Sequence, residues 1–164
     1  MTLLPEWDDR PITVAHLLNP AFCGEIIKIF SSSYQTSKKN SGMPFQLVFL
    51  ALPLVLHKGV RESFPRSSSK NFITWVEENQ SIKMIVPSLI KRTIAYTKES
   101  VMFLMIYDIL KFNDQGEIII IEKTKATKAI NEVAECFKKA ELLGKWLANS
   151  GDSQSIFITL GIKP

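Results

Sequence analysis

Residues 44–58 read PFQLVFLALPLVLHK, and nearly every side chain between Phe45 and Leu56 is apolar. A helix that is hydrophobic on all sides is buried, so this stretch predicts a central core helix that opens at Pro44 and runs to about Lys58. The apolar run is 12 residues long, whereas a membrane-spanning helix needs roughly 20. We therefore expect a soluble protein whose other elements pack around this helix.

Apolar residues recur at helical spacing on both sides of the core helix. Asn19-Pro20 is typical of a helix N-terminus, with Asn as the capping residue and Pro in the first turn. The polar stretch 31–43, SSSYQTSKKNSGM, predicts a loop. A further break is expected at 65–69, and Pro87 predicts a break or kink. The additional predicted helices are 20–33, 71–79, 81–110 and 129–149.

The clearest β signal is residues 111–123, KFNDQGEIIIIEK. A turn sequence before four isoleucines predicts a hairpin, because β-branched residues disfavour helix and suit a strand. A short strand is also expected at 156–160. Helices followed by a hairpin with a Gly turn are the element order of a winged helix. The predicted fold is mainly α with a small β-hairpin: one winged-helix-like domain over residues 13–164, preceded by an extended arm, residues 1–12.

The positive charge of the chain is unevenly distributed. The formal net charge is +4, but residues 28–98 carry eleven Lys or Arg against three Glu, a net of +8, between two mildly acidic ends. Basic side chains interleaved with Ser and Thr suit contact with phosphates. The alternative is that they keep an apolar domain soluble. The candidates for contact with DNA or an acidic partner are Arg66, Lys70, Lys91, Arg92 and Lys98.

No active-site motif stands out in the sequence. It contains no GxxxxGK[ST], GxSxG, HExxH or GxGxxG. His16 and His57 lack Cys or carboxylate neighbours at metal-ligand spacing, so neither metal nor cofactor is expected. Cys23 and Cys136 are interpreted as buried thiols, and a small hydrolase that uses Cys23 is an outlying alternative. The acidic N-terminus does not resemble a signal peptide. We expect a cytoplasmic protein that is not an enzyme.

Several motifs resemble the small middle component of three-component ABC systems, bacterial conflict systems that include Lamassu-type antiphage defence. The motifs are LLNPAFC (17–23), GMPF (42–45), FLALPLVLHK (49–58) and LGIKP (160–164), with Arg10-Pro11, Arg61-Glu62, Pro65-Arg66 and Trp75. The resemblance spans essentially the whole chain, although residues 99–150 carry no matching motif.

The resemblance implies an adaptor without catalytic activity. A middle component is encoded with an SMC- or Rad50-like ATPase, which would bind DNA and ATP, and with an effector, often a nuclease. It would join the two and help hold the effector inactive until foreign DNA is sensed, with DNA contact through the complex and no membrane. The alternative is a free-standing winged-helix DNA-binding regulator. Helix 81–110, however, offers no Asn or Gln to read base edges.

Five residues are candidates for the partner interface. Arg10, His57 and Arg61 match polar positions of the family, and we expect His57, Lys58 and Arg61 to project from the end of the core helix. Arg10, His57 and Arg61 would form hydrogen bonds or ion pairs that fix the arm onto that end or face the ATPase. Alternatively, His57 and Arg61 are internal structural contacts, and Arg10 bonds nearby carbonyls. Trp7 is the fifth candidate, because an aromatic side chain on an extended acidic arm usually has a partner.

Overall fold

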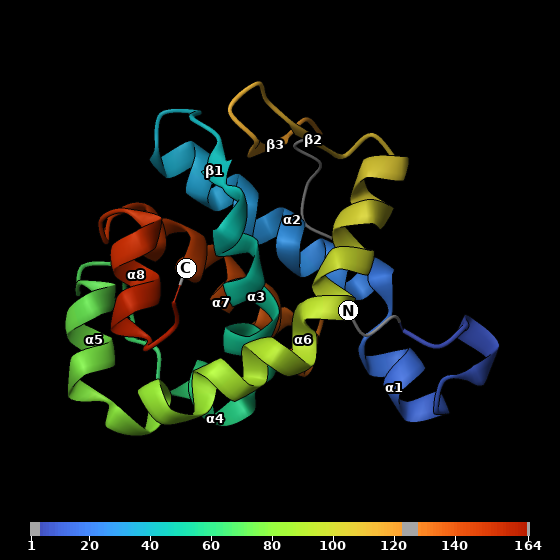
Figure 1. The fold of residues 1–164 in the computed structure, drawn as a ribbon, viewed down its shortest axis with the longest axis horizontal. Helices are drawn as coiled ribbons and strands as arrows, with labels where there is room; N and C mark the ends of the chain where they lie inside the picture. Colours follow the sequence, from blue (N-terminus) through green and yellow to red (C-terminus); the bar gives the residue numbers. More distant parts are fainter. Residues whose placement is uncertain (1–3, 123–127, 164) are drawn as a thin grey trace.

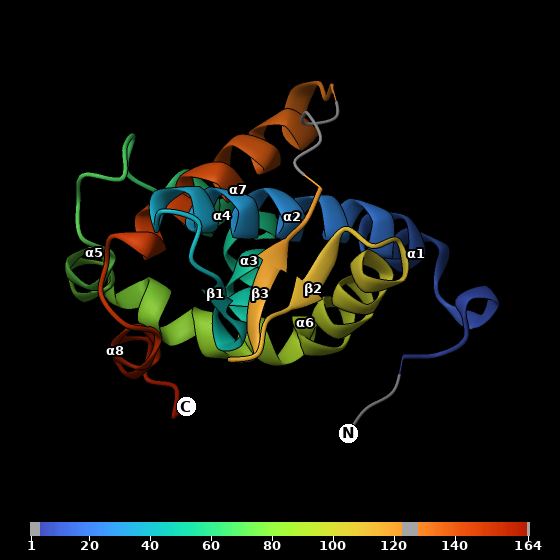
Figure 2. The same cartoon turned by 90° about the horizontal axis from the view of Figure 1, so that it is seen from above.

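The computed structural model describes residues 4–122 and 128–163, and its centre is helix α3 (Val48–Leu56). Figure 2 shows α3 between helices α2 (Pro20–Ser37) and α6 (Gln80–Ile106), which both contact it. Seven of the nine residues of α3 are buried, so the prediction of a central core helix is confirmed. The helix ends at Leu56 rather than about Lys58, and a 3-10 turn, η2 (Phe45–Leu47), leads into it. The end is early because the backbone of His57 is extended and this residue caps the next helix, α4 (Lys58–Glu62).

Helix α2 begins where the sequence predicts. The Asn19 side-chain oxygen accepts a hydrogen bond of 2.8 Å from the Phe22 amide, and Pro20 occupies the first turn. The helix continues to Ser37, so the predicted loop at 31–43 is wrong over its first seven residues. Several polar side chains there, including Ser33, are buried instead of solvated. The Ser33 hydroxyl donates to the Glu141 carbonyl of helix α7 (Asn131–Ala148) at 2.7 Å.

Helices α2 and α7 approach each other closely at Gly144. A Cβ atom at this position would lie 2.3 Å from the Phe30 carbonyl oxygen, well inside van der Waals contact. The absence of a side chain therefore sets the distance between the two helices. Farther along α7, the Trp146 ring packs on Phe72 and Trp75 of helix α5 (Phe72–Glu78), with ring centroids 5.0 Å apart in both pairs.

The predicted hairpin is confirmed and belongs to a three-stranded antiparallel sheet. Strands β2 (Leu110–Phe112) and β3 (Glu117–Ile120) pair with each other, and the short β1 (Met43–Pro44) pairs with β3, giving the order β1-β3-β2. The Gln35 side chain of α2 accepts from the Ile120 amide at 3.0 Å and ties the sheet to the helices. The chain is a mainly helical single domain, and its strand order is compatible with a winged helix.

The break that is one alternative at Pro87 and the strand predicted at 156–160 need correction. Pro87 does not break α6, which continues through it because Ile82, Val86 and Ile90 pack into the core on both sides of the proline. The strand expected at 156–160 is wrong, since this segment is helix α8 (Ser153–Thr159). Ile156 and Leu160 are both buried and lie four residues apart. This spacing is typical of a helix, and the strand prediction did not take it into account.

The N-terminal arm carries more local structure than an extended chain. It contains a 3-10 turn, η1 (Trp7–Asp9), and helix α1 (Ile12–Leu17) starts directly after Pro11. Figure 1 shows α1 at one end of the molecule, with α5 and α8 at the other. Residues 1–3 of the arm, Lys123 of the predicted hairpin and Pro164 lie outside the described residues.

One described stretch, Ile12–Ser37, is long and apolar enough to cross a membrane by length and composition. Core helices of soluble proteins also have these properties. Within this stretch, α2 packs against α7, α6 and α3, which accounts for its apolar face.

Candidate functional site

An open groove lies between the N-terminal arm and helix α6. Its volume is about 1320 Å³, and its walls come from residues 4–10 of the arm and from α6 between Lys91 and Ile106. Two segments separated by more than 80 positions in the sequence therefore form one surface. The groove brings together five of the ten residues that the sequence singles out: Trp7, Arg10, Lys91, Arg92 and Lys98.

Arg10 fixes the arm against α6. Its Nη1 and Nη2 donate to the two carboxylate oxygens of Glu99 at 2.9 and 2.6 Å, and its Nε donates to the Pro5 carbonyl at 3.0 Å. The same guanidinium lies 5.1 Å from the centre of the Trp7 ring. The hydrogen bond with Glu99 raises the pKa of Arg10, as expected for a bidentate pair. Arg10 therefore bonds a nearby carbonyl and also holds the arm, on α6 rather than on the end of the core helix.

Apolar side chains line one end of the groove. Met102 is 62% exposed, Ile106 is 74% exposed, and Trp7 on the facing arm is 47% exposed. Fully burying a large apolar side chain contributes roughly 1.5–3 kcal/mol. A cluster of such side chains on a groove wall marks a surface that another molecule would cover.

Basic side chains line the other part of the α6 wall. Lys91 and Arg92 are exposed and Lys98 is half-buried. Within residues 4–122 and 128–163, none of the three has an ion-pair partner. Their charges are therefore available to a ligand of opposite sign.

The basic segment 28–98 does not form one face. Arg66 and Lys70 belong to the connection between α4 and α5, at the opposite end of the molecule from α1 (Figure 1). Lys70 is paired with Glu78 of α5, and Lys28 is buried and paired with Glu25 at 2.7 Å. The basic residues of this segment therefore lie in separate regions of the surface and core. Of them, Lys91, Arg92 and Lys98 line the groove.

Arg61 does not project from the end of the core helix, and the alternative of an internal structural contact is confirmed. Only 1% of its side chain is exposed, and its Nη1 donates to the Leu56 carbonyl at 3.1 Å. Its Nη2 pairs with Glu132, and its Nε lies 3.5 Å from a Glu135 oxygen. Burial alone lowers the pKa of Arg61, but the hydrogen bond to Glu132 and the other nearby acidic groups outweigh it and raise the pKa overall. Arg61 therefore joins α4 to α7.

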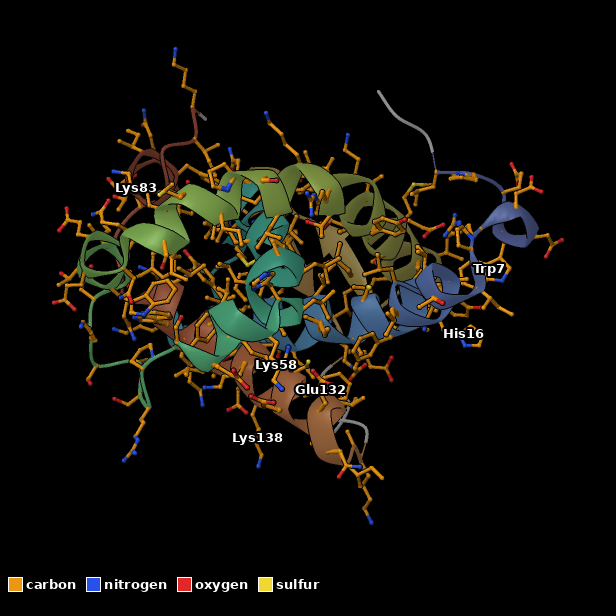
Figure 3. All side chains as sticks on the ribbon, turned by 90° about the horizontal axis from the view of Figure 1, so that it is seen from below. Trp7, His16, Lys58, Lys83, Glu132 and Lys138 are labelled. Carbon is orange, nitrogen blue, oxygen red and sulfur yellow. The ribbon has the colours of Figure 1, made fainter. Side chains whose placement is uncertain are left out.

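The neighbours of Arg61 in the motif have different environments. His57 caps α4, because its Nδ1 accepts from the Val60 amide at 3.2 Å. Lys58 is exposed and lies 3.8 Å from Glu62. Figure 3 shows Lys58 and Glu132 on the same side of the molecule, away from Trp7. Of His57, Lys58 and Arg61, Lys58 has by far the most accessible charge.

The described residues contain neither a metal-ligand cluster nor an exposed cysteine. Among residues 4–122 and 128–163, no group of three His, Cys, Asp or Glu side chains could hold a metal ion. Cys23 is fully buried, and burial raises its pKa to about 12, so its thiol is protonated at neutral pH. Burial also raises the pKa of Cys136. The groove can bind a partner through apolar and charge contacts.

Two features of the site are missed by sequence reasoning. Glu99 follows Lys98 within a basic helix, and nothing local marks it as the partner of Arg10. The exposure of the apolar side chains of Met102 and Ile106 could have been predicted, because residues 101–107, VMFLMIY, are apolar on all sides of the helix. The core covers only some of these side chains, including Val101 and Leu104.

Comparison with known families gives one match. A family model described as "ABC-three component (ABC-3C) system Middle Component 3" matches residues 7–164. No curated protein matches the chain, and neither does any solved structure.

Proposed function

This chain belongs to the ABC-three component system Middle Component 3 family, and from that premise we propose that it is a non-catalytic adaptor. In this proposal it joins an SMC- or Rad50-like ABC ATPase to an effector, a nuclease, in a Lamassu-type antiphage and anti-plasmid defence complex in the cytoplasm. It helps hold the effector inactive until the complex senses foreign DNA. Membership of a middle-component family supports an adaptor role within a multi-component system.

The observation that carries the proposal is the exposed apolar wall of the groove. Met102 and Ile106 follow each other at helical spacing on α6, and Trp7 faces them from the arm. Leaving such side chains in water is unfavourable for an isolated chain, and covering them with a second protein removes that cost. The Arg10–Glu99 pair fixes the facing wall, which reduces the ordering cost of binding.

The environment of the two cysteines supports a role without catalysis. A nucleophilic cysteine needs a stabilised thiolate and access to substrate. Cys23 and Cys136 are both buried, and their pKa values are raised by burial. The hydrolase alternative therefore lacks its nucleophile.

A DNA-binding regulator is the second candidate, because Lys91 and Arg92 are exposed on α6. Two observations make it the weaker one. The helix has no Asn or Gln from residue 81 to its end, so it lacks the amide side chains that read adenine. The groove also exposes the apolar side chains of Trp7, Met102 and Ile106, from which a phosphate backbone gains nothing.

Co-expression with the other two components of the same system tests the proposal. The three full-length proteins are expressed together, with an affinity tag on this chain, and the product is analysed by size-exclusion chromatography with light scattering. The proposal expects a stable complex in which this chain contacts both other components. Recovery of free monomer only would overturn it. Tight, sequence-selective duplex binding by the isolated chain would favour the regulator.

A further inference from the structure

We infer that the groove between the arm and α6 binds an amphipathic helix of a partner subunit, whose acidic side chains face Lys91, Arg92 and Lys98 and whose apolar side chains cover Trp7, Met102 and Ile106. The inference rests on the proposed adaptor function and specifies where and how one partner docks.

The groove wall of α6 is one continuous stripe. Lys91, Ala95, Lys98, Met102 and Ile106 recur at intervals of three or four residues and all line the groove. At 1.5 Å per residue the stripe is about 22 Å long, the length of a partner helix of about 15 residues. Ala95, near its middle, has a small side chain that allows a helix to come close.

The stripe changes character along its length. Its first part is basic, with Arg92 beside Lys91, and its last part is apolar, ending in Met102 and Ile106. Met side chains adapt their shape to a partner surface. A helix that fits this wall has carboxylates toward one end and apolar side chains toward the other, so the charge pattern fixes its direction as well as its sign.

The arm supplies the opposite wall. Trp7 presents an aromatic ring to the groove, and Arg10 is stacked on that ring while it pairs with Glu99. The arm therefore has a defined position before a partner arrives. A partner helix lying between Trp7 and Met102 would bury apolar surface on two sides.

The groove favours a protein helix over nucleic acid. Phosphate backbones gain nothing from the exposed side chains of Trp7, Met102 and Ile106 in this groove. An amphipathic acidic helix uses both the apolar and the basic parts. We therefore treat DNA, and also a second copy of this chain, as competing outcomes of the test.

Site-specific photocrosslinking in the reconstituted three-component complex identifies the occupant. A benzophenone amino acid replaces Met102 or Ile106 in the full chain, and the matched control carries it at Met84, which is 82% exposed on the same helix outside the groove. The crosslinked peptides are sequenced by mass spectrometry. The expected result is one partner segment, crosslinked from both groove positions and not from Met84, with Asp or Glu and apolar residues at intervals of three or four.

Charge reversal tests the sign of the partner. Lys91→Glu, Arg92→Glu and Lys98→Glu together should weaken the complex at least tenfold in dissociation constant, and reversing the carboxylates of the crosslinked segment should restore it. The control is Lys83→Glu, on the same helix but at the far end from Trp7 (Figure 3), which should leave affinity unchanged. Circular dichroism of each variant shows that the fold is kept.

The outcomes separate this inference from the proposed function. A wild-type complex that forms without any crosslink from Met102 or Ile106 overturns the groove as the docking site and leaves the adaptor role standing. Crosslinks to DNA or to a second copy of this chain also overturn it. If the wild-type components form no complex at all, the adaptor proposal fails, and the inference fails with it.

Discussion

Arg10 and Glu99 lie 89 positions apart in the sequence, and two nitrogen atoms of the arginine donate to the two oxygens of that glutamate, at 2.9 and 2.6 Å. The pair connects the arm to the C-terminal half of α6 and joins the two walls of the groove. Arg10 also stacks on Trp7, which places the ring at the groove. The interface candidates on the arm thus depend on one ion pair.

Glu99→Gln should release the arm without unfolding the domain. The amide keeps its size but loses the charge that holds Arg10, so we expect cleavage by chymotrypsin after Trp7 to become roughly five- to tenfold faster, about 1 kcal/mol of lost coupling. The thermal midpoint should change little, because the arm contributes little of the core. The control is Glu141→Gln, which removes an exposed pair with Lys145 on α7. Equal cleavage rates in wild type and Glu99→Gln would show that the pair does not hold the arm.

Arg61→Met should destabilise the whole domain. The substitution removes donors to the Val55 and Leu56 carbonyls and the ion pairs with α7. We expect the free energy of unfolding, measured by urea denaturation, to fall by about 2–4 kcal/mol. The cost stays in this range because Glu132 and Glu135, left without their partner, can still reach water.

Lys58→Met is the matched control for Arg61→Met. Lys58 belongs to the same helix, but its side chain is exposed and its nearest carboxylate oxygen is 3.8 Å away. Its substitution should change stability by less than about 0.5 kcal/mol. Similar losses for both variants would contradict the role assigned to Arg61, and loss of complex formation in Lys58→Met alone would place Lys58 at a partner interface.

The helices and strands that can be predicted well from the sequence are those that a few neighbouring residues determine. The Asn19 cap, the apolar run of α3 and the turn before the four isoleucines each act over a few residues, and each produces the expected structure. The loop expected at 31–43 fails because Ser33 and Gln35 have distant partners, Glu141 and Ile120. A polar side chain looks like a loop residue until the group that satisfies it is known.

The residues of the candidate site also differ in how well the sequence predicts their environment. Sequence reasoning selects Trp7, Arg10, Lys91, Arg92 and Lys98, which the fold brings to one groove. For Arg61 it leaves two alternatives open, projection from the end of the core helix or an internal structural contact, because the partners of this residue cannot be seen in the sequence. Glu132 and Glu135 lie more than 70 positions away, and only the packing of α7 beside α4 reveals that they neutralise Arg61.

Gly144→Ala should destabilise the contact between α2 and α7. The added methyl group would lie 2.3 Å from the Phe30 carbonyl oxygen, so the helices must separate. We expect a loss of about 1–3 kcal/mol in the free energy of unfolding. Gly59→Ala is the control, since its Cβ in α4 would meet only the His57 ring at 3.4 Å, and it should stabilise by about 0.5–1 kcal/mol. A neutral Gly144→Ala would mean that α7 does not approach α2 this closely.

Asp152 makes the capping of α8 dependent on pH. Its carboxylate accepts from the Ser155 amide at 2.9 Å and the Ser155 hydroxyl at 2.8 Å, and these bonds lower its pKa below the ordinary value of 3.8. The folded state thus favours the charged form. The contribution of this carboxylate to the stability of the fold is fully present above its unfolded-state pKa and is lost as the pH falls through its lower folded-state pKa.

Asp152→Asn keeps an acceptor oxygen but does not titrate. The stability difference between wild type and this variant, measured by urea denaturation, should therefore be constant from neutral pH to about 5 and shrink below about pH 4. A difference that stays constant through this acidic range would mean that folding does not shift the pKa of Asp152.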